Sequence, residues 1–562
     1  MELREHDGLA LSHRPRMLID VTRLKRLPAI VWAVSLLLGL FACETSEEIA
    51  EISYFCDTVP ADETGTGAES PTCGADDPNL PPEPTLPTEV CQTLVAVKST
   101  PDENDLDTER IQKALTECKN SEIKVVKLTS DGPNNAFVAA HLVVDSVTLW
   151  IDKGTTLYAS RDAELYQKTG NCGVLGVNDS GACTDFITVS GTSPAIVGHG
   201  VIDGQGGEPL VGRDYSWWQL SNALRDINGS IGNPTLINLA SKTTGFLLYR
   251  ITLHNSAKFH VKITSVPADG TCSAPGEGFI VWGVTVLTPS RWLNSQGLQM
   301  TPHFARNTDG IDPGTTSNAY CGVIACNTIS TGDDQIAIKG GHWVSDVIIA
   351  HNHFGTGHGI SIGSETYGSV VIDGVKHPAV ENVQVYDLTI DGDSRGVGYD
   401  ATQADFNGIR IKSDASRGGV VENVSFRDIC MRDMVNAILI STAYNPLFAG
   451  SKFPQFRRLD FQNIRHVTCM GTRQAVVTIE GFDHTRRTGP VTLDNVVIDN
   501  IGPHAVRAEF ADITLGPGPV NFEFQDDNDK VNVTNRISDD SPPKACVFPT
   551  LPSPEKPDGW LR

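Results

Sequence analysis

Short apolar runs, each about five residues long and ended by Asn, Asp or Gly, recur along the chain from about residue 140 onward. Examples occupy residues 245–249, 278–282, 346–350, 381–385 and 422–426. Runs of this length, bounded by turn residues, predict β-strands rather than helices. A single strand of this kind cannot bury its inner face alone, so the repeated units are expected to stack as coils of a solenoid. The pattern predicts an all-β fold of the parallel β-helix type.

Three segments depart from the strand rhythm. Residues Asp107 to Cys118 have a helical pattern, with Ile111, Ala114 and Leu115 on one face. We expect this short amphipathic helix to cap the N-terminal end of the solenoid. Residues 264–277 and 291–304 are rich in Pro, Gly, Ser and Asn, and both are expected to loop out near the functional patch, where loops control access.

Three turn-like motifs at nearly equal spacing carry the candidate chemistry. The motifs NTDG, TGDD and TGHG set Asp309, Asp333 and His358 apart by 24 and 25 residues, and a short β-branched run follows each. This spacing fits one coil, so equivalent residues would lie on adjacent strands about 4.8 Å apart. Asp334 follows Asp333 directly, and both can face one patch only if Gly332 permits a turn or bulge. We predict a patch of three carboxylates and a histidine.

Such a patch suits acid–base chemistry. Three neighbouring carboxylates repel one another when all are ionised, which raises the proton affinity of at least one of them. A protonated carboxyl can act as a general acid while the others activate a water molecule, and glycoside hydrolysis requires this pair of roles. Turn residues without a catalytic role are the alternative interpretation for each motif taken alone.

A fourth motif, Arg410-Ile411-Lys412, places two cations on one face of a strand and Ile411 on the other. An arginine can bind a carboxylate through two parallel hydrogen bonds, and a lysine adds a point charge. The motif indicates a substrate that carries carboxylates, with a solvated strand face as the alternative.

These motifs, in this order, resemble the four signature motifs of the polygalacturonases, glycoside hydrolase family 28. The longer strings NTDGIDP, GTGHGISIGSE and GIRIKSD are most similar to bacterial endopolygalacturonases. The strings VIDGQG and YSWW extend the similarity, which covers roughly residues 90–500. The resemblance implies a right-handed single-stranded parallel β-helix that hydrolyses α-1,4-galacturonosyl linkages in polygalacturonate, the pectin backbone, with inversion.

The resemblance also implies catalytic roles. Asp333 would be the general acid, and Asp309 and Asp334 would activate the attacking water. His358 would tune the protonation of the acid. Gln335 departs from the family pattern, since a cysteine is common at this position.

Four further residues would contact the substrate if the resemblance holds: Arg410, Lys412, Tyr444 and Asn307. The first two would bind the galacturonate carboxylate, and Tyr444 would lie at the same subsite. Endo attack is expected, although the inserts at 264–277 and 291–304 could narrow the groove into an exo-acting pocket.

Other functions remain open at this stage. Hydrolysis of rhamnogalacturonan or a substituted galacturonan would use the same acids. A lyase is less consistent with this pattern, because β-elimination in pectic polymers uses bound calcium and a strong base. A surface β-helix that only binds polysaccharide is the alternative without catalysis. No cofactor or metal is implied, and the charge disfavours nucleic-acid binding.

The formal net charge of −24 arises to a large extent outside the predicted catalytic domain. Residues 44–90 contain twelve Asp or Glu and no Lys or Arg, and they include Pro-rich stretches. We expect this acidic segment to be an extended linker. An anionic substrate is therefore compatible with the charge, provided that the cleft itself is locally basic.

The N-terminal segment resembles an export signal. Residues 27–42 are apolar and follow Arg23, Lys25 and Arg26, and they are too few for a membrane span of about 20 residues. The run ends in LFAC, which resembles a bacterial lipobox, so Cys43 would become the lipid-modified first residue. We expect residues 1–43 to be a lipoprotein-type signal peptide, and the exported monomer to be lipid-anchored at the cell envelope or else secreted. Its catalytic domain would cover 91–540 and a Pro-rich tail 541–562.

The thirteen cysteines of an exported chain predict disulfides. If Cys43 carries lipid, an even number remains. The best local pairs are Cys91 with Cys118 and Cys172 with Cys183. Less constrained expectations are Cys321 with Cys326, Cys430 with Cys469, and Cys272 with Cys546. A zinc site is the alternative, but the sequence has no close CxxC or HxxxH pair to support it.

Overall fold

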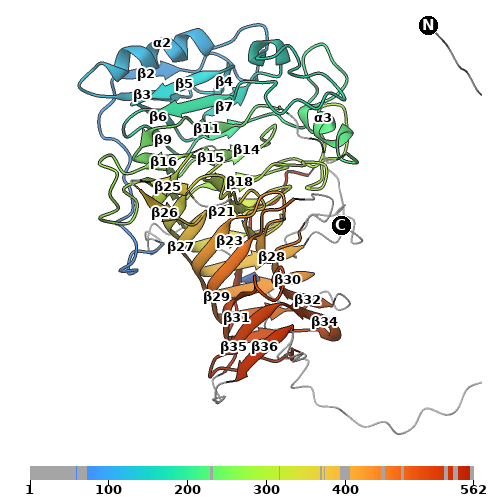
Figure 1. The fold of residues 1–562 in the computed structure, drawn as a ribbon. Coiled ribbons are helices and arrows are strands. Elements are labelled where there is room, and N and C mark those ends of the chain that lie inside the picture. Colours follow the sequence, from blue (N-terminus) through green and yellow to red (C-terminus); the bar gives the residue numbers. More distant parts are fainter. Residues whose placement is uncertain are drawn as a thin grey trace, which may run out of the picture. The chain divides into compact units, whose positions relative to one another are not determined.

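The computed structural model describes residues 58–59 and 73–556, apart from 228, 230–231, 316, 368–369, 373, 393–405, 445–449, 470–473, 525–529 and 536–541. The predicted export signal, with Cys43, lies outside the described residues. The described part is a parallel β-helix in which successive coils contribute strands to two long sheets (Figure 1). This confirms the predicted all-β class.

One long sheet has eleven parallel strands, which include those that follow the candidate catalytic motifs. In chain order they are β5 (Leu142–Asp145), β8 (Ile187–Ser190), β11 (Ile237–Leu239), β15 (Val261–Ile263), β19 (Ile311–Pro313), β22 (Ile336–Ile338), β24 (Ile360–Ile362), β28 (Asn407–Lys412), β30 (Asn436–Ser441), β32 (Ala475–Glu480) and β34 (Ile501–Glu509).

The second long sheet collects twenty strands from the remaining walls of the coils. They are β2 (Gln92–Val95), β3 (Val125–Thr129), β4 (Ala136–Ala139), β6 (Thr148–Ile151), β7 (Thr156–Ala159), β9 (Ala195–Val197), β10 (Val201–Asp203), β13 (Phe246–Tyr249), β14 (Thr252–His254), β17 (Phe279–Trp282), β18 (Thr285–Leu287), β20 (Ala319–Ala325), β21 (Thr328–Ser330), β23 (Val344–Phe354), β27 (Val380–Asp391), β29 (Val420–Arg432), β31 (Gln455–Val467), β33 (Thr488–Ile498), β35 (Ala511–Leu515) and β36 (Val531–Asn535).

Three small sheets complete the strand pairs of the described residues. Two are parallel, β1 (Thr58–Val59) with β37 (Phe548–Pro549) and β12 (Thr243–Thr244) with β16 (Ser265–Val266). The third is antiparallel, β25 (Val370–Ile372) with β26 (Val375–His377).

The five apolar runs singled out in the sequence lie in β13, β17, β23, β27 and β29. They stack in register through β20, and the aligned column is Phe246, Phe279, Gly322, Val347, Val383 and Val424. The column is buried inside the coils. Burying one large apolar side chain contributes about 1.5–3 kcal/mol, so stacking supplies the stability that one coil lacks.

Helices are few. The predicted cap is confirmed as α2 (Thr108–Lys119), which lies at one end of the stack and buries Ile111, Ala114 and Leu115 (Figure 1). A second helix, α3 (Trp217–Ala223), begins with a reciprocal cap between Ser216 and Gln219. A 3-10 helix covers Ala163–Tyr166. No helix among the described residues is long and apolar enough to cross a membrane.

The expectation of an extended linker is wrong for residues 73–90, which we call the N-terminal strap. A disulfide joins Cys73 to Cys326, and Glu83 forms an ion pair with Arg250. Leu80, with Leu86, packs on an apolar patch of the second long sheet. Composition alone does not reveal these contacts, because a few apolar residues and one cysteine attach a segment that is otherwise acidic and Pro-rich.

Five disulfides join two cysteines that are both among the described residues. Cys91–Cys118 and Cys172–Cys183 are confirmed. The other three are Cys73–Cys326, Cys272–Cys321 and Cys430–Cys546, so the remaining expected pairs are wrong. The confirmed pairs span 27 and 11 residues, whereas Cys73 and Cys326 are 253 residues apart and meet only because the coils stack. Cys469 is also disulfide-bonded, and a disulfide sulfur cannot serve as a zinc thiolate.

The two inserts differ in whether they reach the cleft. Residues 264–277 contribute β16, and the Cys272–Cys321 disulfide attaches them to β20. None of these residues lines the cleft described below, so the expectation for this insert is wrong. Residues 291–304 reach the cleft through His303. The insert at 264–277 instead follows β15 and packs against the next coil.

Candidate active site

The candidate residues gather on the outer face of the eleven-stranded sheet. Four of its strands align through their buried isoleucines, with Ile311, Ile336, Ile360 and Ile409 in one column. The catalytic motifs immediately precede the first three of these strands, so stacking brings them together. A cleft of about 700 Å³ lies there. It is lined by all eight predicted catalytic and substrate-binding residues: Asn307, Asp309, Asp333, Asp334, His358, Arg410, Lys412 and Tyr444.

The pairing register differs from the one that the motif spacing indicated. Ile311 pairs with Ile336, and the Gly310 N–H donates to the Asp334 carbonyl at 2.9 Å. Asp334, rather than Asp333, therefore occupies the coil position equivalent to Asp309. Asp333 lies one residue earlier, in the turn before β22.

Close packing of the loops explains the glycine before the two acids. A Cβ atom on Gly332 would lie 2.2 Å from the Ala305 carbonyl oxygen and 2.3 Å from that of Pro302. The Thr308 hydroxyl donates to the Ala305 carbonyl at 2.7 Å and accepts from the Gly332 N–H at 3.0 Å. These contacts fix the turn that directs both Asp333 and Asp334 into the cleft.

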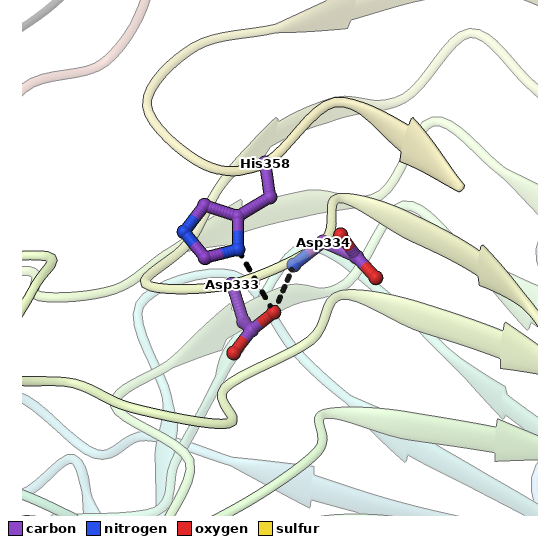
Figure 2. A group of neighbouring side chains, drawn as sticks. All are labelled: Asp333, Asp334 and His358. Carbon is purple, nitrogen blue, oxygen red and sulfur yellow. Dashed lines mark hydrogen bonds and ion pairs between the residues drawn. The ribbon is translucent and has the colours of Figure 1, made fainter. Parts of the chain in front are cut away.

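Asp333 and His358 form a close pair. The Nδ1 atom of His358 lies 3.1 Å from Oδ1 of Asp333, and the Asp334 N–H donates to the same oxygen at 3.0 Å. Figure 2 shows the Asp333 carboxylate turned toward the imidazole, with the Asp334 carboxylate pointing away. Gly359 follows the histidine at φ +76°, and a Cβ there would lie 2.0 Å from the Gly408 carbonyl. Only glycine fits this turn.

Asp334 is buried and bound by cations. Its Oδ1 accepts hydrogen bonds from Arg410 and from the Ser361 hydroxyl, and its Oδ2 lies 3.2 Å from the Lys412 ammonium. The Arg410 Nε donates to the Ser361 hydroxyl at 3.1 Å. Because Ile409 and Ile411 face the core, the alternation of β28 directs Arg410 and Lys412 into the cleft, as the sequence predicted.

Asp309 has a different environment. Its Oδ2 accepts a hydrogen bond from the Lys339 ammonium at 3.0 Å, and its Oδ1 makes no hydrogen bond to the described residues. Lys339 also lies 3.8 Å from Asp312 and 3.7 Å from Glu365. One buried lysine is therefore shared among three acids.

These environments separate the pKa values of the acids. Burial raises the pKa of Asp309 to about 7, Lys339 opposes this rise, and the neighbouring carboxylates add to it. Burial would also raise the pKa of Asp334, but Arg410 and Lys412 outweigh that effect and lower it to about 2. The cluster therefore retains a proton at a pH where isolated aspartates have lost theirs.

The pKa of Asp333 is well below its usual range. Burial opposes the charged form, but the charges of His358, Lys412 and Arg410 outweigh burial. The pKa of His358 is raised in turn, because Asp333 outweighs the effect of burial on the imidazole. In the ligand-free cleft the proton of this pair lies on the histidine.

The cleft is locally basic in an acidic protein. Its lining includes six Lys or Arg residues and five acids. The cations are Arg225, Arg306, Lys339, Arg410, Lys412 and Arg417, and the acids are Asp309, Asp333, Asp334, Glu365 and Asp414. This meets the condition under which the sequence allowed an anionic substrate.

The cluster of Asp333, Asp334 and His358 brings three ligand atoms within 4.8 Å of one another, as a metal site would. However, Arg410 and Lys412 already bind Asp334, and their charges would repel a cation. A protonated imidazole also lacks the lone pair that a metal needs. The arrangement fits proton transfer better than metal binding.

Comparison with known proteins agrees with this geometry. The solved structure of a polygalacturonase from Erwinia carotovora ssp. carotovora is 31% identical, with a TM-score of 0.58, and covers 82% of this chain and 97% of that one. The family model of glycosyl hydrolases family 28 matches residues 176–514. The chain belongs to this family. Among its relatives, a Ralstonia nicotianae polygalacturonase is 35% identical over 463 residues, covering 75% of this chain and 80% of that protein. An endo-polygalacturonase of Pectobacterium parmentieri is 36% identical over 436 residues, covering 76% and 92%.

The sequence predicted Asn307 and Tyr444 as substrate-binding residues of this family 28 protein, and the structure shows the contacts that each one makes in the cleft. Asn307 has φ +59°, and its backbone N–H donates to Asp333 Oδ2 at 3.3 Å. Tyr444 is 41% exposed, and its ring centroid lies 5.0 Å from the Lys412 ammonium. Such a half-exposed ring beside a cation offers an apolar face to a sugar.

Gln335, the departure from the family pattern, is structural in this protein. Its side chain is buried, donates to the Gly355 carbonyl at 2.8 Å and accepts from the Gly359 N–H at 2.5 Å. The glutamine therefore bridges one coil to the turn that carries His358.

Sequence reasoning missed four cations that line the cleft, Lys339, Arg225, Arg306 and Arg417. Lys339 follows Ile336-Ala337-Ile338 just as Lys412 ends its own alternating strand, so the same pattern was available as a signal. Arg306 directly precedes the first motif. Arg225 follows α3 and had no signal, because its position depends on how that helix packs.

Proposed function

We propose that this protein hydrolyses α-1,4-galacturonosyl linkages in polygalacturonate with inversion of configuration. The observation that carries the proposal is the joint placement of three aspartates and the Arg410–Lys412 pair in one cleft. The aspartates can act as the general acid and general base of hydrolysis, and the cations fit a substrate with a carboxylate on each sugar. Relatives named polygalacturonase support the same conclusion.

In the proposed mechanism, Asp333 donates a proton to the glycosidic oxygen as the bond from that oxygen to the anomeric carbon breaks. A water molecule held by Asp309 and Asp334 attacks the anomeric carbon from the opposite face and loses its proton to one of these carboxylates. The products are a new reducing end, which carries the hydroxyl group of the water, and a free hydroxyl on the leaving sugar. The proton that Asp333 gives up is balanced by the one that the base takes from the water. Asp334, with its lowered pKa, is ionised for this role.

Substrate binding gives Asp333 its proton in this proposal. A galacturonate carboxylate placed between Arg410 and Lys412 would cancel part of the positive charge that lowers the pKa of Asp333. The proton held by His358, 3.1 Å away, can then pass to Asp333. Once Asp333 is protonated, its charge no longer raises the pKa of Asp309, and Lys339 remains beside Asp309 to stabilise its ionised form.

We propose endo attack, which the named endo-polygalacturonase relatives support. The alternative of exo attack rests on residues 291–304, which reach the cleft through His303. The test is incubation of residues 44–562 with demethylated polygalacturonate, following reducing ends, ultraviolet absorbance and product length. Reducing ends without absorbance, with mixed oligomers, support the proposal. Unsaturated products, or no release at all, contradict it.

We further propose that Cys43 carries a lipid that anchors the exported protein. The apolar run and lipobox-like ending of residues 27–43 support this proposal. Labelling with a radioactive fatty acid in a bacterial host, followed by detergent partitioning, tests it against Cys43→Ala. Equal labelling of the two proteins would refute the anchor and favour a plain secretory signal.

A further inference from the structure

Arg225 and Arg306 line the cleft on one side of the three acids. Arg225 follows α3, in the connection between β10 and β11, and Arg306 directly precedes Asn307. In the eleven-stranded sheet β11 lies before β19, while β28, which carries Arg410, lies beyond β24. The acids precede β19 and β22, so the two pairs of cations flank them.

Within the described part of the chain, neutral groups hold Arg225. Its guanidinium donates to the Asn222 side-chain oxygen at 2.6 and 3.1 Å and to the His303 carbonyl at 2.8 Å. No ion pair joins Arg225 to a carboxylate of the described residues. Arg410, by contrast, is bound to Asp334.

Arg306 lies close enough to Arg225 for their charges to interact. Burial lowers the pKa of Arg306, the charge of Arg225 lowers it further, and Asp333 opposes both effects. Its NH1 donates to the Ser221 carbonyl at 2.9 Å. These two half-buried like charges repel each other, so an anion bound between them would be stabilised by both.

We propose that Arg225 and Arg306 form a second carboxylate site, which binds the galacturonosyl unit across the scissile bond from the Arg410–Lys412 site. This inference rests on the proposed function and assigns residues to the recognition of the second sugar. Both sugars that flank the cleaved bond must then carry free carboxylates. A methyl ester removes the charge and leaves a desolvated guanidinium without its partner, so esters on either side of the bond are rejected.

The first test compares kcat/KM on fully demethylated polygalacturonate and on pectin of about half esterification, in low salt. The variants are Arg225→Gln and Arg225→Lys. Arg458→Gln serves as the matched control, because Arg458 is an exposed arginine that pairs with Glu422 and does not line the cleft.

We expect Arg225→Gln to lose about 10- to 100-fold on polygalacturonate and much less on the esterified polymer, so that the preference for the acid form falls. Arg225→Lys should retain part of this preference, and Arg458→Gln should change neither activity. If Arg225 only supports Asn222 and the 301–306 loop, both activities fall by the same factor. That result, or no change in the preference, would overturn the proposal.

The second test separates this site from the hydrolytic function. Calorimetry measures binding of trigalacturonate, and of its methyl ester, to Asp333→Asn and to Asp333→Asn with Arg225→Gln. We expect the added change to weaken binding of the acid at least about tenfold and to leave the weaker binding of the ester unaltered. If the two variants bind the acid with equal dissociation constants, the second site is overturned even if hydrolysis is confirmed. If the wild type does not hydrolyse the polymer, the binding measurement still tests the site.

Discussion

The Lys339 ammonium lies 3.0 Å from Oδ2 of Asp309, which joins the first acid of the cleft to a buried cation. Lys339 follows β22, the strand that Asp333 and Asp334 precede. The two acids therefore lie at one end of β22, and Lys339, which stabilises the ionised form of Asp309, lies at the other end. The pKa of Lys339 is raised well above its usual value, since Asp309 and Asp312 outweigh the effect of burial.

Replacing Lys339 should shift the pH dependence of hydrolysis. Lys339→Met removes the charge that opposes the effect of burial on Asp309, so the pKa of Asp309 should rise above about 7. Asp309 must be ionised to activate water, so the acidic limb of the kcat/KM profile should move up by about one pH unit or more. Lys339→Arg should shift it less. Superimposable profiles for Lys339→Met and the wild type would contradict this role.

Asp312 should make the fold less stable as the pH rises. Burial and Asp309 raise its pKa well above 3.8, so above that pH the unfolded chain releases a proton that the folded protein still holds. The unfolding free energy therefore falls with increasing pH through this window. Asp312→Asn should raise the Tm by a few degrees at pH 7 and leave it unchanged below pH 3.8, as followed by calorimetry. A lower Tm at pH 7 would show that the ionised carboxylate is needed for stability.

Loss of the general acid should abolish turnover without abolishing binding. Asp333→Asn keeps the size of the side chain but cannot donate the proton to the leaving oxygen, so kcat should fall about 10²- to 10⁴-fold or more. Release of reducing ends measures turnover, and calorimetry with trigalacturonate measures binding. Near-normal turnover would mean that another group is the acid.

Lys412→Ala should act mainly on substrate binding. It removes a cation that faces Tyr444 and lies 3.2 Å from Asp334, so KM for polygalacturonate should rise about tenfold or more. A smaller fall in kcat is expected, because the pKa of Asp334 rises toward its usual value when this charge is lost. If kcat instead changes more than KM does, Lys412 acts mainly in the chemical step and not in substrate binding.

The N-terminal strap should behave as part of the folded domain. A chain that begins at residue 73 keeps Leu80, Leu86 and the Cys73–Cys326 disulfide, whereas one that begins at residue 91 exposes the apolar patch beneath them. We expect the shorter chain to have a Tm several degrees lower and to aggregate, with the same kcat in the soluble fraction. Equal melting temperatures would make the strap dispensable.

Local patterns in the sequence determined much of this protein. The apolar runs at 246–249 and 279–282, the capping helix and the two short-range disulfides all follow from neighbours in the chain. The motif residues also follow, because one period of the solenoid places residues about 25 apart on adjacent strands. Membership of the family was accessible from the same motifs.

Other features depend on how whole coils pack. The register that aligns Asp309 with Asp334 depends on the turn at Gly332, where the 302–305 loop leaves no room for a side chain. Arg225 reaches the cleft only because α3 packs there, and Cys73 meets Cys326 across 253 residues. Composition predicted an extended linker, whereas the strap is attached to the domain at a few residues. The sequence by itself determined the repeated strand and the turn that carries the acids, because these are short-range properties of the chain. Only the tertiary structure decided the charge environment of each acid, because burial and cations distant in the sequence set its pKa.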